Sequence, residues 1–279
     1  MKRAYSFDDV LLKPKYSDLT SRTEVDLSSE LGPGITLALP VISSPMDTVT
    51  EVDMARSMDQ AGAMGIVHRY NTIEEQSRLV QTARETGTEN IGAAIGMTGD
   101  YFERATAVCA AGANVLCVDV AHGHHVMMQR ALSELKGAFG DSVHIIAGNV
   151  ATLEAFEDLA RWGADSIRVG IGGGSICSTR LVTGHGVPTL QSIMDVGQTT
   201  SEAKIIADGG IKTTGDMVKA IAAGADFVMV GSMLAGTEET PGETLLTAKG
   251  GKYKVYRGMA SSAAQRNWRG KSSTPEGIS

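Results

Sequence analysis

The chain has 279 residues, of which 42% are hydrophobic and 20% are charged, so it is long enough to bury one large core. Its formal net charge of −7 argues against nucleic acid or an anionic membrane as a bulk partner. No apolar run is long enough to span a membrane, and the first residues lack the apolar stretch of a signal peptide. The spacing of Cys109, Cys117 and Cys177 does not suit a metal, so we expect unpaired thiols in a reducing cytoplasm.

Eight apolar segments recur along the chain without polar alternation, which is typical of parallel strands buried on both faces. Helical patterns separate them, for example at 72–84 and 152–163, where Thr152 is a suitable N-cap. Four helices end in Gly-Ala just before a strand, and glycine is the usual residue of a left-handed helix end. In chain order the expected strands are 40–45, 64–68, 90–96, 114–120, 144–150, 166–172, 204–210 and 227–232.

This alternation of eight strands and helices, without a break in composition, predicts a single (β/α)8 barrel over residues 1–279. A doubly wound open sheet is the alternative that the same alternation allows. In a barrel the chemistry lies where the strands end and the following loops begin. The residues just after each predicted strand are therefore the candidate site.

Two glycine-containing loops follow the predicted seventh and eighth strands, where such barrels often bind phosphate through backbone N–H groups. They contain Asp208–Gly210 and Gly231–Ser232. The glycines allow a phosphate to approach the backbone, Ser232 adds a hydroxyl donor, and Asp208 can accept hydrogen bonds from sugar hydroxyls. These residues predict a pocket for a nucleoside monophosphate.

A third loop, GIGGGSICST at 170–179, places a thiol just beyond four glycines. The plainer interpretation is a flexible turn with a small buried side chain, and the functional one is a phosphate cradle beside a nucleophile. Backbone N–H groups of such a loop can stabilise a thiolate and other nearby negative charge. Cys109 and Cys117 fall in a predicted helix and a predicted strand, where we expect an ordinary packing role.

The loop and several other segments resemble landmarks of the inosine-monophosphate dehydrogenase and GMP reductase family, and they occur in the same order. A proline is usual in that family where Gly173 stands. The resemblance covers nearly the whole chain. The segments that carry it are SFDDVLLKP at 6–14, SSPMDTVTE at 43–51, IRVGIGGGSICST at 167–179, ADGGIKTTGD at 207–216, GSMLAGTEETPGE at 231–243 and YKVYRGMAS at 253–261.

The resemblance implies that Cys177 attacks C2 of a purine nucleotide and that Thr179 and Glu276 carry the proton of the leaving group. It places Asp208 on the ribose, and Asp119 on the nicotinamide ribose of the cofactor with Asn149 nearby. The residues implied for the phosphate are Ser175, Gly210, Gly231, Ser232 and Tyr256. Those implied for the base are Ser44, Met46, Gly258 and Met259. In some relatives, backbone carbonyls of the corresponding loop bind a monovalent cation. The resemblance therefore implies a candidate K+ site at the carbonyls of Gly172, Gly174 and Cys177.

Within the family, the features of this chain favour GMP reductase, which uses NADPH to convert GMP into IMP and ammonia. The segment 258–279, which matches a mobile flap, contains Arg266 and Arg269 but no Arg-Tyr pair, and that pair marks the dehydrogenase. No regulatory domains interrupt the chain after its second helix, and DVAHGH at 119–124 resembles the reductase.

Two alternatives stay open. One is an IMP dehydrogenase without regulatory domains, which TGHGVP at 183–188 and YRGMAS at 256–261 resemble. The other is a nucleotide-binding barrel that is inactive because it lacks the closing segment found after the flap in relatives. By analogy with the family we expect a homo-oligomer, a tetramer, whose small-molecule substrate is GMP or IMP.

Overall fold

Eight parallel strands close into a barrel in the computed structural model, which describes residues 3–261 together with 264, 266 and 268. Neighbouring strands follow the order β10-β3-β4-β5-β6-β7-β8-β9. The closed barrel confirms the predicted (β/α)8 fold over the open sheet. Its strands are β3 (Val41–Ser43), β4 (Met64–Val67), β5 (Ile91–Ile95), β6 (Val115–Asp119), β7 (His144–Val150), β8 (Ser166–Val169), β9 (Lys204–Asp208) and β10 (Phe227–Val230).

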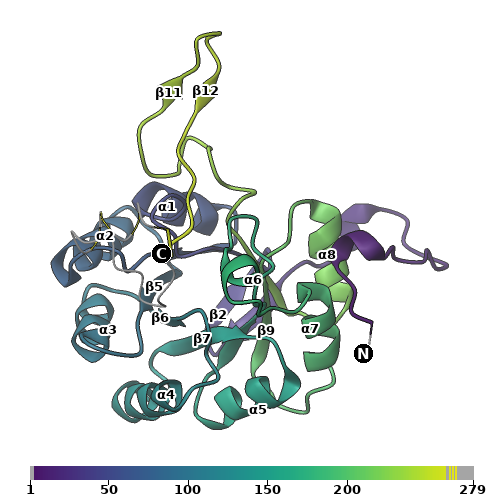
Figure 1. Ribbon diagram of the computed structural model, residues 1–279, viewed down its shortest axis with the longest axis horizontal. Coiled ribbons are helices and arrows are strands. Elements are labelled where there is room, and N and C mark those ends of the chain that lie inside the picture. The colour runs from purple at the N-terminus through teal and green to yellow at the C-terminus, as the bar shows by residue number, and fades with distance from the viewer. Residues whose placement is uncertain (1–2, 262–263, 265, 267, 269–279) are drawn as a thin grey trace.

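Helices surround the barrel and connect consecutive strands (Figure 1). Thr72 and Thr152 cap two of them, because each side-chain oxygen accepts a hydrogen bond from a backbone N–H of the first turn, that of Glu75 or Ala155. The helices are α1 (Val52–Gln60), α2 (Ile73–Glu85), α3 (Tyr101–Ala110), α4 (Val126–Phe139), α5 (Leu153–Arg161), α6 (Thr179–Val182), α7 (Thr189–Val196) and α8 (Thr214–Ala222). Short 3-10 turns occur at Phe7–Asp9 and Arg22–Glu24.

The four glycines that were expected to end helices all adopt the left-handed backbone conformation. Their φ angles are 75° at Gly62, 113° at Gly112, 108° at Gly163 and 118° at Gly224. A side chain at these positions would strain the backbone, so each glycine lets the chain leave a helix and turn directly into the next strand.

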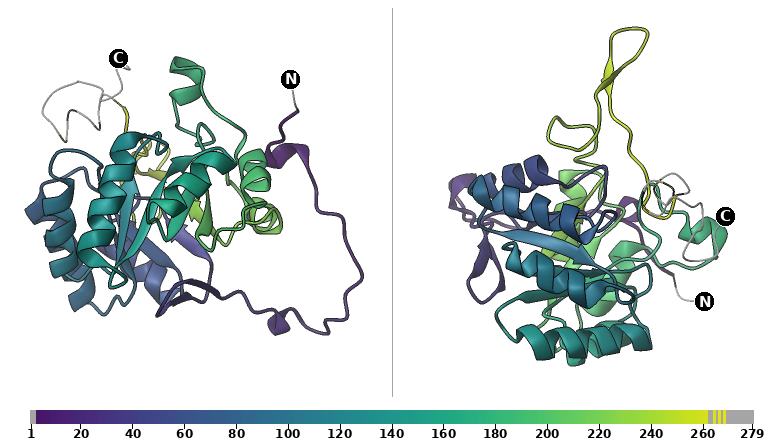
Figure 2. Two further views of the ribbon diagram at one scale, coloured as in Figure 1. Left: turned by 90° about the horizontal axis from the view of Figure 1, so that it is seen from below. Right: turned by 90° about the vertical axis from the view of Figure 1, so that its left-hand side faces the viewer.

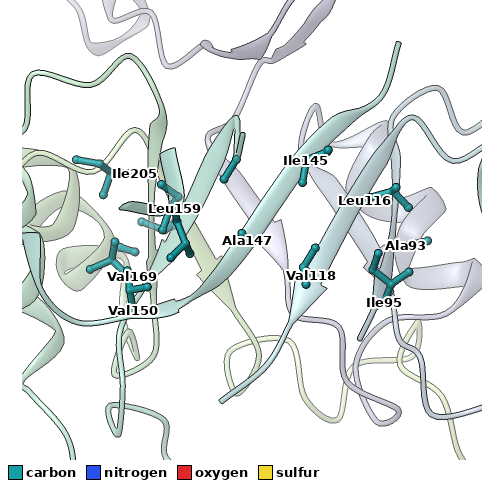
Figure 3. Close-up of a cluster of buried hydrophobic side chains, with 14 of the residues drawn as sticks. Ala93, Ile95, Leu116, Val118, Ile145, Ala147, Val150, Leu159, Val169 and Ile205 are labelled. Carbon is teal, nitrogen blue, oxygen red and sulfur yellow. The ribbon is translucent and has the colours of Figure 1, made fainter. Parts of the chain in front are cut away.

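Apolar side chains lie on both faces of the strands and form two clusters. The outer cluster lies between the strands and the helices and includes Ile95, Val118, Val169 and Leu159 (Figure 3). The inner cluster fills the barrel. It includes side chains of an antiparallel hairpin, β1 (Ser29–Gly32) and β2 (Ile35–Leu37), that was not predicted. Because these side chains pack with the first residues of β4, β6 and β10, the hairpin closes the amino-terminal end of the barrel.

Two segments extend away from the barrel. A hairpin of β11 (Leu245–Leu246) and β12 (Lys252–Tyr253) projects at the top of Figure 1. The chain before β1 runs as a long extended segment, visible in the left view of Figure 2. No helix in the described part of the chain has the length and apolar character needed to cross a membrane.

Candidate active site

Side chains from both ends of the chain converge on Gly231, which follows β10. A Cβ atom at Gly231 would lie 3.2 Å from Ser44 Oγ, 3.2 Å from Met46 Sδ and 3.3 Å from Tyr256 Oη. Ser44 is fixed because its backbone N–H donates to the carbonyl of Val230, the last residue of β10. The structure therefore brings four of the predicted substrate residues together around one bare stretch of backbone.

The loops after β8 and β9 lie so close together that side chains are excluded between them. A Cβ atom at Gly170 would lie 1.9 Å from the carbonyl oxygen of Asp208, and one at Gly209 would lie 3.0 Å from the backbone nitrogen of Gly174. Gly170, Gly209 and Gly210 have φ angles of 147°, 88° and 80°, which favour glycine. These glycines let the two loops approach each other closely, and the approach of a phosphate to them stays a prediction.

Cys177 lies at the end of this glycine loop, half-buried, just before the short helix α6. Its backbone N–H donates to the carbonyl of Gly174 at 3.2 Å, and its Sγ donates to Thr179 Oγ1 at 3.3 Å. The thiol predicted as the nucleophile is therefore in contact with the Thr179 hydroxyl, which was predicted to transfer the proton. Glu276, assigned to the same step, lies outside the described residues.

Tyr256 connects the carboxyl-terminal segment to the glycine loop. Burial raises the pKa of its phenol, a hydrogen bond with the Ser175 side chain opposes that rise, and the charge of Asp208 adds to it. A neutral phenol beside Ser175 can donate a hydrogen bond to a phosphate oxygen. Gly258 also approaches the loop, since its Cβ would lie 3.1 Å from the carbonyl oxygen of Ile176. The predicted phosphate residues Ser175 and Ser232 are both exposed at this surface.

Asp119 and Asp208 end β6 and β9, and one arginine joins their carboxylates. Arg168 Nη1 donates to Asp119 Oδ1, and Nη2 donates to Asp208 Oδ2 at 2.8 Å. Burial lowers the pKa of Arg168, but the charges of Asp208 and Asp119 outweigh it and raise that pKa well above its ordinary value. Asn149 Nδ2 donates to Asp208 Oδ2 and to the carbonyl of Gly170, both at 2.8 Å. Both predicted ribose carboxylates are therefore held in place by protein donors.

Sequence reasoning missed two members of this site. Arg168 is the one charged residue in the apolar strand SIRV, and that position was itself a signal, because a buried charge needs a partner. Arg257 forms an ion pair with Asp47, and Asp47 N–H donates to Met259 Sδ at 3.5 Å. These contacts attach the segment 256–259, which contains the predicted phosphate residue Tyr256 and the predicted base residues Gly258 and Met259, to the loop after β3.

Two residues predicted for the cofactor, Asp119 and Asn149, keep groups that can contact a ribose hydroxyl. Asp119 is 19% exposed, and Asn149 uses its amide hydrogens within the protein, which leaves its Oδ1 for a ligand hydroxyl. Of the three carbonyls predicted for K+, that of Gly174 accepts the Cys177 N–H and keeps a second lone pair. K+ binding at Gly172, Gly174 and Cys177 stays a prediction.

Comparison with known proteins identifies the relatives of this chain. A family model described as IMP dehydrogenase / GMP reductase domain matches residues 4–279. The inosine-5'-monophosphate dehydrogenase of Nitrosopumilus maritimus is 35% identical over 388 aligned positions, which cover 94% of this chain and 81% of that protein. That of Cryptosporidium parvum is 39% identical over 312 positions, covering 96% and 76%. The GMP reductase of Leishmania major is 34% identical over 390 positions, covering 91% and 79%.

The lengths of these alignments bear on the two activities. All three exceed the 279 residues of the chain, so each relative has segments without a counterpart here. The alignment with the protein named a reductase spans 390 positions, and that with the Cryptosporidium parvum dehydrogenase spans 312, so the reductase has the greater extra length. Inserted length therefore does not separate reductase from dehydrogenase among these relatives.

Proposed function

Because the chain belongs to the IMP dehydrogenase / GMP reductase family, whose members are nicotinamide-dependent oxidoreductases, we propose that it acts on C2 of a purine nucleotide through the Cys177 thiolate. The observation that carries the proposal is the placement of this thiol. It lies 3.3 Å from the Thr179 hydroxyl, at the end of a loop of nearly bare backbone that contacts the loop of Asp208. A planar base can approach a nucleophile in such a loop without meeting side chains.

The surrounding residues define how the nucleotide would lie. Asp208 would accept hydrogen bonds from the ribose hydroxyls. The bare backbone of Gly210 and Gly231 and the side chains of Ser175, Ser232 and Tyr256 would hold the phosphate. Ser44, Met46 and the Gly258–Met259 backbone would contact the base. The convergence of Ser44, Met46 and Tyr256 on Gly231 supports this arrangement, because all of them lie within 3.3 Å of one point.

We propose the reductive deamination of GMP as the reaction, with NADPH as cofactor. The Cys177 thiolate adds to C2, and the 2-amino group leaves as ammonia after accepting a proton through the Thr179 hydroxyl. NADPH, when bound near Asp119 and Asn149, supplies the hydride that takes the place of the amino group at C2. The bond between sulfur and C2 then breaks, which releases IMP and restores the thiolate. Overall, GMP, NADPH and two protons give IMP, NADP+ and ammonium.

The choice of reductase rests on the segment 258–279, which contains Arg266 and Arg269 but no Arg-Tyr pair. That pair would activate the water of a dehydrogenase, which hydrolyses the same covalent adduct. The second candidate is IMP dehydrogenase, and a specific observation favours it: two of the relatives described above are named for that activity. Both reactions need the Cys177 adduct, so the proposal for the thiol holds for either.

One spectrophotometric assay separates these reactions. GMP with NADPH should lose absorbance at the reduced-nicotinamide band, and IMP with NAD should leave it unchanged. A gain with IMP and NAD would contradict the reductase and favour the dehydrogenase. Binding of GMP without turnover of either pair would instead indicate a nucleotide-binding barrel. Cys109→Ala, at a half-buried helix position, is the matched control for Cys177→Ala and should keep full activity.

A further inference from the structure

Arg168 reaches across the barrel mouth between two strands that are not neighbours. It lies on β8, whereas Asp119 ends β6 and Asp208 ends β9, and β7 separates β6 from β8. The crossing is open because the residue beside it on β7 is Gly148, whose Cβ would lie 2.7 Å from Arg168 Cβ. Arg168 is only 6% exposed. The guanidinium is therefore a buried bridge between the carboxyl ends of β6 and β9.

The carboxylates of Asp119 and Asp208 each use one oxygen to bind Arg168 and have a second oxygen that does not bind it. Arg168 holds Asp119 Oδ1 and Asp208 Oδ2. Among the described residues, neither Asp208 Oδ1 nor Asp119 Oδ2 accepts a hydrogen bond, and Arg69 Nε lies 4.0 Å from Asp119 Oδ2. The side chains of Asp119 and Asp208 are 19% and 15% exposed. Asp119 Oδ2 and Asp208 Oδ1 are thus available to the hydroxyl groups of a bound ligand, one at each end of the bridge.

A single guanidinium shared by two carboxylates makes their positions interdependent. An arginine stays charged in a protein, and its planar donors fix the direction of each hydrogen bond. A ligand that draws Asp208 outward or rotates it therefore changes how Arg168 faces Asp119, and the reverse also holds. The low dielectric of a buried site strengthens this electrostatic link.

We propose that Arg168 is a positioning residue that couples the two ribose subsites, so that binding of the purine nucleotide at Asp208 raises the affinity for the nicotinamide cofactor at Asp119. This inference rests on the proposed function, which places one ribose at each carboxylate. Linkage requires the coupling to be reciprocal, so NADPH must raise the affinity for GMP by the same factor. Arg168 acts here through Asp119 and Asp208, which its guanidinium holds.

The test measures this factor by calorimetry in the Cys177→Ala background, where both ligands can be present without turnover. The dissociation constant of GMP is determined with and without saturating NADPH. We expect about a tenfold ratio in the parent, within the range usual for coupled sites. Arg168→Met should bring the ratio below about twofold, and Arg168→Lys, which retains the charge, should restore it above about threefold.

Arg69→Met is the matched control. Arg69 also lies beside Asp119, and its Nη2 donates to the Asp119 carbonyl at 3.1 Å, but Asp208 is not among its contacts in the described residues. Its loss should weaken NADPH binding and leave the ratio unchanged. Circular dichroism checks that each variant folds. If Arg168→Met does not fold, Arg168→Gln, which also removes the charge, takes its place and should likewise bring the ratio below about twofold.

The outcomes separate the inference from the proposed function. A parent that binds neither GMP nor NADPH would contradict the proposed function. A parent with no coupling, or an Arg168→Met or Arg168→Gln variant that keeps the full ratio, would overturn the role of Arg168 while leaving the assignment of the subsites intact.

Discussion

Gly173 lies where any larger residue would collide with Thr189. A Cβ atom at Gly173 would be 2.2 Å from Thr189 Oγ1 and 3.2 Å from the backbone of Gly209. Gly173 is not among the glycines with positive φ, so its backbone conformation itself would accept alanine. Thr189 is 4% exposed, and its hydroxyl oxygen has no hydrogen-bond partner in the described part of the chain. A side chain at residue 173 is therefore excluded on steric grounds, mainly by the hydroxyl of Thr189.

This collision sets the magnitude expected for Gly173→Ala. An extra carbon in a packed site typically costs about 1–3 kcal/mol, because neighbouring groups must shift. The backbone next to the added carbon belongs to the loops that we assign to the phosphate and the thiolate. If the displacement of these loops reduces the binding free energy of GMP by about 1.4 kcal/mol, the affinity for GMP falls about tenfold. The remainder should appear as a lower free energy of unfolding.

Thr189→Ala should reverse the effect, because it removes the atom that Cβ meets. Alone it should change stability little, since the lost packing is offset by removal of a buried hydroxyl without a partner. We expect the double variant to recover both the urea midpoint and the GMP affinity, with a coupling energy of about 1–3 kcal/mol in the double-mutant cycle. Gly96→Ala is the control, since its Cβ would meet no atom closer than 3.6 Å at the end of β5.

Two results would refute this reasoning. One is a Gly173→Ala variant that matches the parent in both urea unfolding and GMP binding. The other is a double variant whose effects are the sum of the single ones, because additivity would mean that the two positions do not share the space. The proline that the family usually carries at this position has a Cβ too, so Gly173→Pro should likewise require the loss of the Thr189 hydroxyl.

Three further predictions concern the rest of the molecule. Burial lowers the pKa of His144 from 6.5 to about 4, so the unfolded chain binds more protons between these values. The contribution of His144 to the free energy of unfolding should be complete above pH 6.5 and be lost, by on the order of 3 kcal/mol, toward pH 4; in urea titrations His144→Gln should lose less stability than the parent over this range. Burial raises the pKa of Cys109 to about 11 and that of Cys117 to about 12, so iodoacetamide at pH 7.5 should label Cys177 alone, with protection by GMP, as mass spectrometry would show. Labelling of Cys109 or Cys117 at a similar rate would contradict this expectation. Leu11 and Tyr16 are 89% and 94% exposed in the extended segment before β1, so we expect them to contact another subunit. Light scattering should find an oligomer that Leu11→Glu with Tyr16→Glu dissociates. A monomeric parent would contradict the predicted tetramer.

The barrel was predictable because its signals are local. Each strand is a short, mostly apolar run, and several helices carry their own N-cap, such as Thr72, Thr152 and Thr213. The glycines at 62, 112, 163 and 224 mark helix ends within a few residues of the next strand. The hairpin of β1 and β2 was missed, although Pro33–Gly34 is a turn signal. Its strands have only four and three residues, and their burial depends on the barrel that they enter.

The contact between Cys177 and Thr179 is local in the same way, since the two residues lie two positions apart in one loop. The bridge of Arg168 is not local, because its partners lie 49 and 40 residues away, at Asp119 and Asp208. The ion pair of Asp47 with Arg257 joins residues 210 apart. Only the closed barrel brings such charges together, and a sequence pattern gives no distance between them.

Mass spectrometry of a trapped adduct tests the central claim most directly. The intact protein is quenched in acid during turnover with GMP and NADPH, and the same is done with Cys177→Ala. We predict a nucleotide mass on the parent, located at Cys177 by digestion, and neither adduct nor turnover in the variant. A Cys177→Ala variant that converts GMP at the rate of the parent would contradict the account.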